Sequence, residues 1–479
     1  MARSINYFVF GKFANMIYNI DMSNILIQNG LLVDTEWKRH ADLYIEGGKI
    51  KRIAPHIDVK TLPPDVTEVN AEGKLVLPGL IDAHTHYHLV SRGTVTADSF
   101  PEGSKCAAFG GVTTVIDFAD DNKVNLSEST KARLAEMHHN MAVDYALHEG
   151  VYKYRDTLPQ EMAELKKRGV TAIKLFTTYK NVGYLIEKRE ELKAVFKAAK
   201  ENNLLVCVHC EDDELITKID KDWKGGYAPI DHAYLRPAEA EAKGIETVGS
   251  IALELDMPVY IVHLSSRLGL EMVRRLRGDG AKIIVETTPH YLFLNSTLLE
   301  RSDGSLYVMT PPLREESDNL ALQEALCNGE IQVVATDHCT FTKEQKLQSN
   351  DCRTILPGIP GTEEMLPLIN TMTTNSSLTI QQVVNVLSTG PAKAFGLYPN
   401  KGSLKEGTDA DIVIFDPDTA WTLSNENIHS KSGYTCYDGW NVIGKVVMTY
   451  LRGRLILGGD MYLGIKGDGR FLKGHKSEL

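Results

Sequence analysis

Two histidines, His84 and His86, have a spacing that could hold a metal ion. The residues before them, 74–82, are mostly apolar and predict a strand, on which side chains two positions apart point to the same face. Two imidazoles would therefore project together from a strand end, and neutral imidazole is a preferred ligand of zinc and similar ions. Such a pair also arises by chance on solvated loops. The rest of the chain must therefore decide between a metal site and a chance pair.

The elements that would position these histidines alternate between short apolar strands and amphipathic helices. The apolar residues from Leu192 to Ala199, for example, follow the i, i+3, i+4, i+7 spacing of a helix with one buried face. Alternation of this kind predicts a parallel sheet, and eight strands fit a (β/α)8 TIM barrel of the α/β class. After the strand that leads to His84, the predicted strands are 113–117, 145–148, 172–176, 204–209, 259–264, 283–287 and 333–337.

Both ends of the chain are rich in short strands and turns, which the middle is not. The simplest account is a small β-sandwich domain formed from both chain ends. Residues 1–21 precede this pattern, and we interpret them as an extension of unclear role or a short docking helix. The predicted divisions are the extension at 1–21, the N-terminal segment of the β-sandwich at 22–77, the (β/α)8 barrel at 78–400, the C-terminal segment of the β-sandwich at 401–465 and a tail at 466–479.

Five of the predicted barrel strands contain or end in a polar side chain. In a (β/α)8 barrel the active site lies at the C-terminal ends of the strands. Burying a charged group without a partner costs several kcal/mol, so a single polar residue in a strand is usually a core residue with a hydrogen-bond or ion-pair partner. Polar residues on five strands that converge at one end of a barrel instead predict a metal site. The polar residues are His84 and His86 on the first strand, Lys174 on the fourth, His209 and Glu211 on the fifth, His263 on the sixth and Asp337 on the eighth.

Lys174 has two interpretations. Burial lowers the pKa of a lysine, and a neutral amine can react with CO2 to form a carbamate, an anion able to bridge two metal ions. Alternatively, its ammonium group pairs with Glu211 or Asp337. The spacing alone does not decide between them.

The bulk composition bears on partners and compartment. The net charge of −11, from 52 basic and 63 acidic residues, argues against nucleic acid as a partner. No apolar run approaches the roughly 20 residues of a membrane span, so we expect no membrane association. Seven scattered cysteines do not form a disulfide framework, and the expected setting is a reducing cytoplasm. Cys207 and Cys210 form a CxxC that we interpret as belonging to a buried strand.

From about residue 25 to residue 472, the chain resembles the cyclic amidohydrolases, and most closely the hydantoinase/dihydropyrimidinase family. The resemblance covers nearly the whole chain, and its motifs together are highly specific. They are 78–86, 96–100, 108–114, 173–176 with Tyr179 and Lys180, 261–265, 311–314, 335–339 and 358–361.

The resemblance implies two divalent metal ions, expected to be zinc, although manganese or cobalt could occupy the same ligands. His84, His86 and Asp337 would bind one ion, and His209 and His263 would bind the other. Lys174, as an N6-carboxylysine, would bridge both ions. A hydroxide between the ions would open a hydantoin or dihydropyrimidine ring to an N-carbamoyl amino acid. Asp337 would carry the proton to the leaving nitrogen, and Tyr179 would donate a hydrogen bond to the developing oxyanion.

The resemblance also implies three substrate contacts, Tyr179, Thr310 and Pro357, two of which depart from the family pattern. Thr310 stands where the family usually has serine, and Pro357 where it usually has asparagine. Relatives use these positions largely through backbone groups, so anchoring is expected to persist, although Pro357 has no N–H to offer. Because of these two departures, the resemblance does not fix the substrate preference. The sequence gives neither the ring size nor the stereospecificity.

Two alternatives compete with a hydantoinase or dihydropyrimidinase. The first is a sister activity, such as that of allantoinase or dihydroorotase. Dihydroorotase relatives carry an arginine directly after the HxH motif, and Tyr87 at that position argues against this activity. The other is a non-catalytic scaffold like the neuronal collapsin-response proteins, which lack the metal ligands, whereas here all six ligand positions are filled. The family further implies a homotetramer, to which residues 467–472 would contribute contacts.

Overall fold

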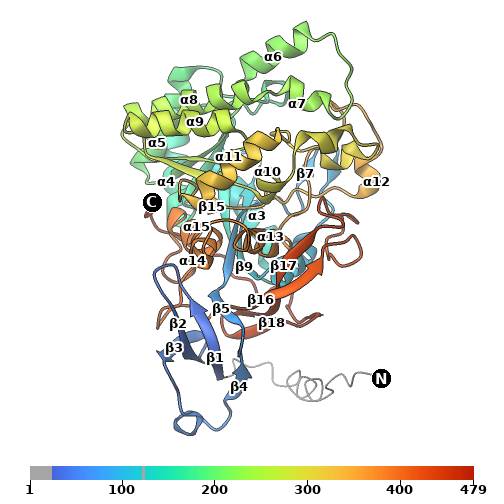
Figure 1. Cartoon of the computed structure of the whole chain (residues 1–479). Helices are drawn as coiled ribbons and strands as arrows, with labels where there is room; N and C mark the ends of the chain where they lie inside the picture. Colours follow the sequence, from blue (N-terminus) through green and yellow to red (C-terminus); the bar gives the residue numbers. More distant parts are fainter. Residues whose placement is uncertain (1–23, 121–123) are drawn as a thin grey trace.

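The structure is a computed structural model that describes residues 24–120 and 124–479. The predicted extension at 1–21 lies outside the described residues. The remainder forms a barrel of parallel strands and a separate sheet built from both chain ends, which confirms the predicted fold class (Figure 1).

The barrel consists of eight strands in the order β15-β14-β13-β12-β11-β10-β9-β6, and each pairs in parallel with the next. A parallel bridge between Thr85 and His338 joins the two ends of this sheet, and the His86 N–H donates to the His338 carbonyl at 2.9 Å. These contacts close the barrel beside the HxH motif. The strands are β6 (Leu80–Thr85), β9 (Val112–Ala119), β10 (Asp144–Gly150), β11 (Ala172–Phe176), β12 (Leu205–His209), β13 (Val259–Ile261), β14 (Ile283–Thr287) and β15 (Val333–Val334).

Helices surround the barrel because each can bury one apolar face against it. In α5 the predicted face from Leu192 to Ala199 is buried, while the opposite side is charged. α4 ends at Gly169, whose φ of 95° provides the left-handed conformation that terminates many helices. The helices are α2 (Phe100–Phe109), α3 (Leu126–His138), α4 (Leu158–Arg168), α5 (Arg189–Glu201), α6 (Asp213–Asp222), α7 (Asp231–Leu235), α8 (Ala238–Glu254), α9 (Arg267–Gly278), α10 (Pro289–Phe293), α11 (Glu316–Cys327), α12 (Lys343–Lys346), α13 (Met365–Met372), α14 (Ile380–Val384) and α15 (Gly390–Ala394).

The second sheet joins the two chain ends in the order β19-β18-β17-β16-β5-β1-β2-β3, with β4 paired to β1. In Figure 1 its blue and red strands lie together below the barrel. A buried ion cluster joins the sheet to the barrel, because Lys401 Nζ lies 2.6 Å from Asp144 of the barrel and 2.7 Å from Asp411 of the sheet. The strands are β1 (Ile25–Val33), β2 (Lys38–Glu46), β3 (Lys49–Ala54), β4 (Thr67–Asn70), β5 (Leu75–Pro78), β16 (Ile412–Thr422), β17 (Asn441–Leu451), β18 (Arg454–Gly458) and β19 (Met461–Tyr462).

The apolar run before the HxH motif differs from the prediction of one strand. It is two strands in two sheets, β5 and β6, divided at Gly79. A Cβ at Gly79 would lie 2.2 Å from Thr113 Oγ1, so only glycine fits, and its N–H donates to the Asp411 carbonyl at 2.7 Å. The break therefore lets a single run of residues cross from the end sheet into the barrel.

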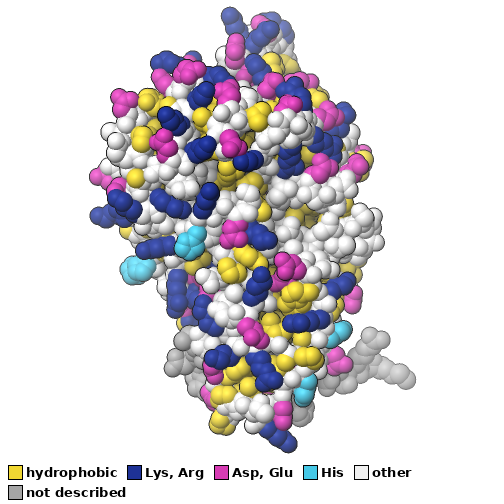
Figure 2. All heavy atoms as spheres, turned by 90° about the vertical axis from the view of Figure 1, so that its left-hand side faces the viewer, with side chains coloured by type: hydrophobic (Ala, Val, Ile, Leu, Met, Phe, Trp, Pro, Cys, Tyr) yellow, Lys and Arg dark blue, Asp and Glu magenta, His cyan; other side chains and the backbone are white. Residues whose placement is uncertain are grey.

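On the face shown in Figure 2, basic and acidic side chains are interspersed over the helical upper region of the molecule. None of the helices in the described residues combines the length and the apolar character that crossing a membrane requires.

Candidate active site

The structure brings the six predicted metal ligands to the C-terminal end of the barrel. His84 belongs to β6, Lys174 to β11 and His209 to β12, whereas the other three lie one to three residues beyond the ends of their strands. Most are almost wholly buried; His86 and Asp337 keep 16% and 15% of their side chains exposed. The six predicted ligands on or after these strands are His84, His86, Lys174, His209, His263 and Asp337.

Three of these residues form one group. Asp337 Oδ1 lies 3.3 Å from His84 Nε2 and 3.2 Å from His86 Nε2. Their ligand atoms are close enough together to hold one cation, and two imidazoles with a carboxylate are a donor set that suits zinc. Burial raises the pKa of Asp337, but the neighbouring His84 and His86 lower it more, so its carboxyl group is ionised.

His209 and His263 form a second group, with His209 Nδ1 only 2.9 Å from His263 Nε2. The His84 and His263 rings stack at a centroid distance of 5.5 Å, so the two groups share one centre. Burial lowers the pKa of both His209 and His263, which favours the neutral imidazole that binds metals.

Two buried carboxylates, Glu286 and Glu211, orient these rings from behind. Glu286 Oε1 accepts from His84 Nδ1 at 2.8 Å, and Glu211 Oε2 accepts from His209 Nε2 at 2.7 Å. Each carboxylate holds the ring proton on its own side, so the other ring nitrogen presents a lone pair to the shared centre. The residues of the first group therefore fit a divalent cation, and the two neutral imidazoles of the second group offer the same kind of donor atom.

Lys174 lies among these side chains with no ion-pair partner among the described residues. Its Nζ is 5.5 Å from the centroid of Phe118 and 5.3 Å from that of Phe176. Glu211 is engaged by His209 and by a nearby arginine, and Asp337 by two histidines, so neither carboxylate pairs with this amine. Burial lowers the pKa of Lys174, which favours the neutral amine.

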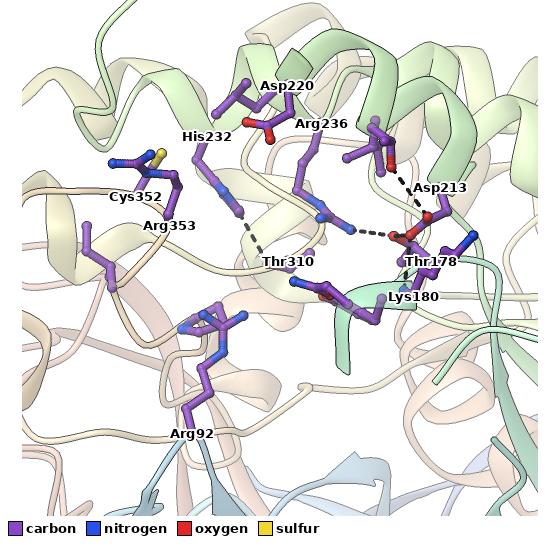
Figure 3. A pocket seen from close by; sticks show the side chains of 17 residues that line it. Arg92, Thr178, Lys180, Asp213, Asp220, His232, Arg236, Thr310, Cys352 and Arg353 are labelled. Carbon is purple, nitrogen blue, oxygen red and sulfur yellow. Dashed lines mark hydrogen bonds between the residues drawn. The ribbon is translucent and has the colours of Figure 1, made fainter. Parts of the chain in front are cut away.

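A cavity of about 540 Å³ is lined by Tyr179, Thr310 and Pro357. Figure 3 shows it, with Thr310 labelled. The structure thus brings the three predicted substrate contacts together. The Tyr179 ring also packs against His209, at a centroid distance of 5.3 Å, and so links the cavity to the predicted metal ligands. Burial raises the pKa of Tyr179, which keeps its hydroxyl protonated and able to donate.

Several predicted site residues have a left-handed backbone. Tyr179, His263 and Asp337 have φ values of 69°, 38° and 49°. Such conformations cost about 1–3 kcal/mol for residues other than glycine and cluster at functional sites. Each of these residues lies two or three positions beyond the end of a barrel strand.

The sequence interpretation missed residues that support the site from α7 and β14. Arg236 Nη2 lies 2.6 Å from Glu211 Oε2, and its guanidinium lies 5.0 Å from the Tyr179 ring centroid. His232 Nε2 lies 3.0 Å from the Met309 carbonyl, beside Thr310. Arg236 and His232 could not be found from the sequence, because no strand pattern surrounds the residues in and after α7. Glu286 could have been found, because it is a charged residue inside the apolar run 283–287.

Lys346 of α12 was also missed, although it fixes the backbone around two substrate contacts. Its Nζ donates to the carbonyl groups of Val308, Leu356 and Gly358 at 2.6, 3.0 and 3.0 Å. Two of the acceptors flank Pro357, and the third precedes Thr310 by two residues. These hydrogen bonds fix the backbone on both sides of Pro357, which lines the cavity.

Comparison with known proteins agrees with this geometry. Residues 75–456 match the amidohydrolase family. A D-hydantoinase from Ralstonia pickettii is 35% identical over 460 residues, covering 95% of this chain and 99% of that protein. A D-hydantoinase from Rhizobium radiobacter is 35% identical over 462 residues with the same coverage. The crystal structure of dihydropyrimidinase from Brevibacillus agri NCHU1002 superimposes with a TM-score of 0.91 at 33% identity, covering 95% of this chain and 99% of that one.

Proposed function

Because the chain belongs to the amidohydrolase family, and within it to the hydantoinase/dihydropyrimidinase group, we propose that it hydrolyses a cyclic amide bond with the help of two divalent cations. The reaction would open a hydantoin or dihydropyrimidine ring to an N-carbamoyl amino acid. The observation that carries the proposal is the convergence of four histidines, Asp337 and a buried Lys174 at the same end of the barrel.

The proposed ligand sets follow the two groups of the site. His84, His86 and Asp337 would hold one ion, and His209 and His263 would hold the other. Lys174 would contribute to both as a carbamate, formed when its neutral amine attacks CO2 and releases a proton. When bound, the two cations would acidify the attacking water and polarise the scissile carbonyl group. Zinc is the expected metal, since imidazole and carboxylate ligands suit it.

The protein's own side chains would complete the reaction. Tyr179 stands between the cavity and His209, where its protonated hydroxyl can donate to the carbonyl oxygen as negative charge develops there. Asp337, ionised and directed at the same centre, would accept the proton of the attacking water and pass it to the leaving ring nitrogen. Thr310 and the Pro357 carbonyl would hold the ring through hydrogen bonds at the cavity wall.

A substrate panel tests this function. The purified enzyme would be assayed for ring opening of hydantoin, phenylhydantoin, dihydrouracil, allantoin and dihydroorotate. We expect hydantoins or dihydrouracil to be opened with the highest kcat/KM. Hydrolysis of allantoin or dihydroorotate alone would assign the chain to a sister activity, and hydrolysis of none of the five would contradict the proposal.

The assembly and the compartment belong to the same proposal. We expect a homotetramer, which light scattering after size-exclusion chromatography would reveal. A reducing cytoplasm is supported by the free thiols of all seven cysteines.

A further inference from the structure

Arg92 carries a positive charge into the cavity from the hairpin of β7 (Val90–Ser91) and β8 (Thr94–Val95). Figure 3 shows its side chain extending from the hairpin toward the space between Thr310 and the opposite wall. The same cavity is lined by Tyr179. Arg92 therefore shares the cavity wall with Tyr179 and Thr310, two of the proposed substrate contacts.

The conformation of Arg92 is unusual for an arginine. Ser91 pairs with Thr94, so Arg92 and Gly93 form a two-residue turn, with φ values of 48° and 78°. Turns with positive φ at both central residues favour asparagine, aspartate or glycine at the first position. An arginine there costs conformational energy, and strain of this kind is characteristic of residues kept for function.

The other three cations that line the cavity are neutralised by partners, whereas Arg92 has no ion-pair partner in the described residues. Lys180 pairs with Glu187, Arg236 with Glu211, and Arg353 with Asp351, at 2.5–2.6 Å. The lining carboxylates, Asp213 and Asp220, belong to α6 on the far side of the cavity from Arg92 (Figure 3).

We propose that Arg92 forms a specificity site for an anionic group, so that the preferred substrates are cyclic amides whose exocyclic substituent carries a carboxylate. This inference rests on the proposed function and names its substrate class. A guanidinium matches the planar, bidentate geometry of a carboxylate. The substituent would reach Arg92 while the ring stays beside Tyr179, and α6 across the cavity would repel a substituent that turned the other way.

Two hydantoins of nearly equal shape test the inference. One is 5-carboxymethylhydantoin, which is anionic at neutral pH, and the other is its neutral amide, 5-carbamoylmethylhydantoin. We expect the wild-type enzyme to favour the anion in kcat/KM by about tenfold, because a charge-assisted hydrogen bond contributes this much. The preference should weaken at about 0.5–1 M salt, because the salt screens a partly exposed pair.

The turn supplies matched variants. Arg92→Asn and Arg92→Asp place residues that the turn favours, so the hairpin is retained while the charge is removed or reversed. We expect the anion-to-amide ratio of kcat/KM to fall about tenfold in Arg92→Asn, to fall below one in Arg92→Asp, and to be largely kept in Arg92→Lys. Lys60→Gln changes the net charge equally on an exposed position of the end domain and should leave the ratio as in wild type.

The outcomes separate the two proposals. If the wild type hydrolyses the neutral amide but shows no preference for the anion, the Arg92 site is wrong and the cyclic amidase activity stands. If the preference exists but survives in Arg92→Asn and Arg92→Asp, Arg92 is not its source. If the wild type opens neither ring, nor any other cyclic amide, the proposed function fails and the inference fails with it.

Discussion

Replacing Lys346 by methionine should loosen the proposed substrate contacts without altering the proposed metal ligands. Lys346 is fully buried and its three hydrogen bonds tie Val308 to the backbone on both sides of Pro357. Methionine keeps a similar volume and removes the donors, so the change isolates the hydrogen bonds from the packing.

The magnitude follows from these bonds. Three buried hydrogen bonds at about 1 kcal/mol each predict a loss of about 3 kcal/mol in the free energy of unfolding. For the substrate, one misplaced anchor such as the Pro357 carbonyl corresponds to about 1.4 kcal/mol, or roughly a tenfold rise in KM. The anchor acts on the ground state and the transition state alike, so kcat should change by less than about threefold.

The assay combines steady-state kinetics with urea unfolding and metal analysis. Lys343→Met is the matched control, because Lys343 lies on the same short helix α12 with its side chain exposed. The control should resemble the wild type in all three measurements. A Lys346→Met variant that is destabilised yet keeps the wild-type KM would refute the positioning role, and one with wild-type stability would refute the energetic argument.

The remaining predictions concern the oxyanion contact, the carboxylate behind His84 and the pH dependence of stability. Tyr179→Phe should lower kcat by about 10²–10³ and leave the metal content intact, and loss of metal would contradict this assignment. Glu286→Gln should weaken metal affinity about 10–100-fold in a chelator competition, because His84 loses the carboxylate at 2.8 Å; unchanged affinity would count against it. Burial lowers the pKa of Lys346 from 10.5 to about 7, so the folded state binds fewer protons than the unfolded state between these values. The cost of burying its charge is therefore full below pH 7 and relieved toward 10.5, so urea unfolding should show the stability of wild type relative to Lys346→Met rising over this window.

Much of the fold follows from local patterns in the sequence. The strands at 172–176 and 283–287 coincide with β11 and β14, because each is an apolar run bounded by turns. The eighth strand was predicted as 333–337 but β15 ends at Val334. Its remaining residues leave the ladder, and Asp337 adopts a positive φ, which a strand pattern does not encode.

The candidate site was predictable to the extent that its residues interrupt apolar strands. Lys174 and His209 could be found in this way, since each stands in a strand that is otherwise apolar. Residues on loops and short helices carry no such periodic signal, and Arg92, Arg236 and Lys346 reach the site only through long-range folding. Their roles depend on contacts between segments far apart in the chain, which spacing along the sequence cannot provide.

Metal analysis of the purified protein tests the central claim most directly. We predict about two equivalents of divalent metal per chain in the wild type, and less than about one in Lys174→Ala, whose activity should return partially when small carboxylic acids replace the carbamate. A wild-type enzyme that hydrolyses cyclic amides with no bound metal, or a Lys174→Ala variant that keeps both its metal and its turnover, would contradict the account.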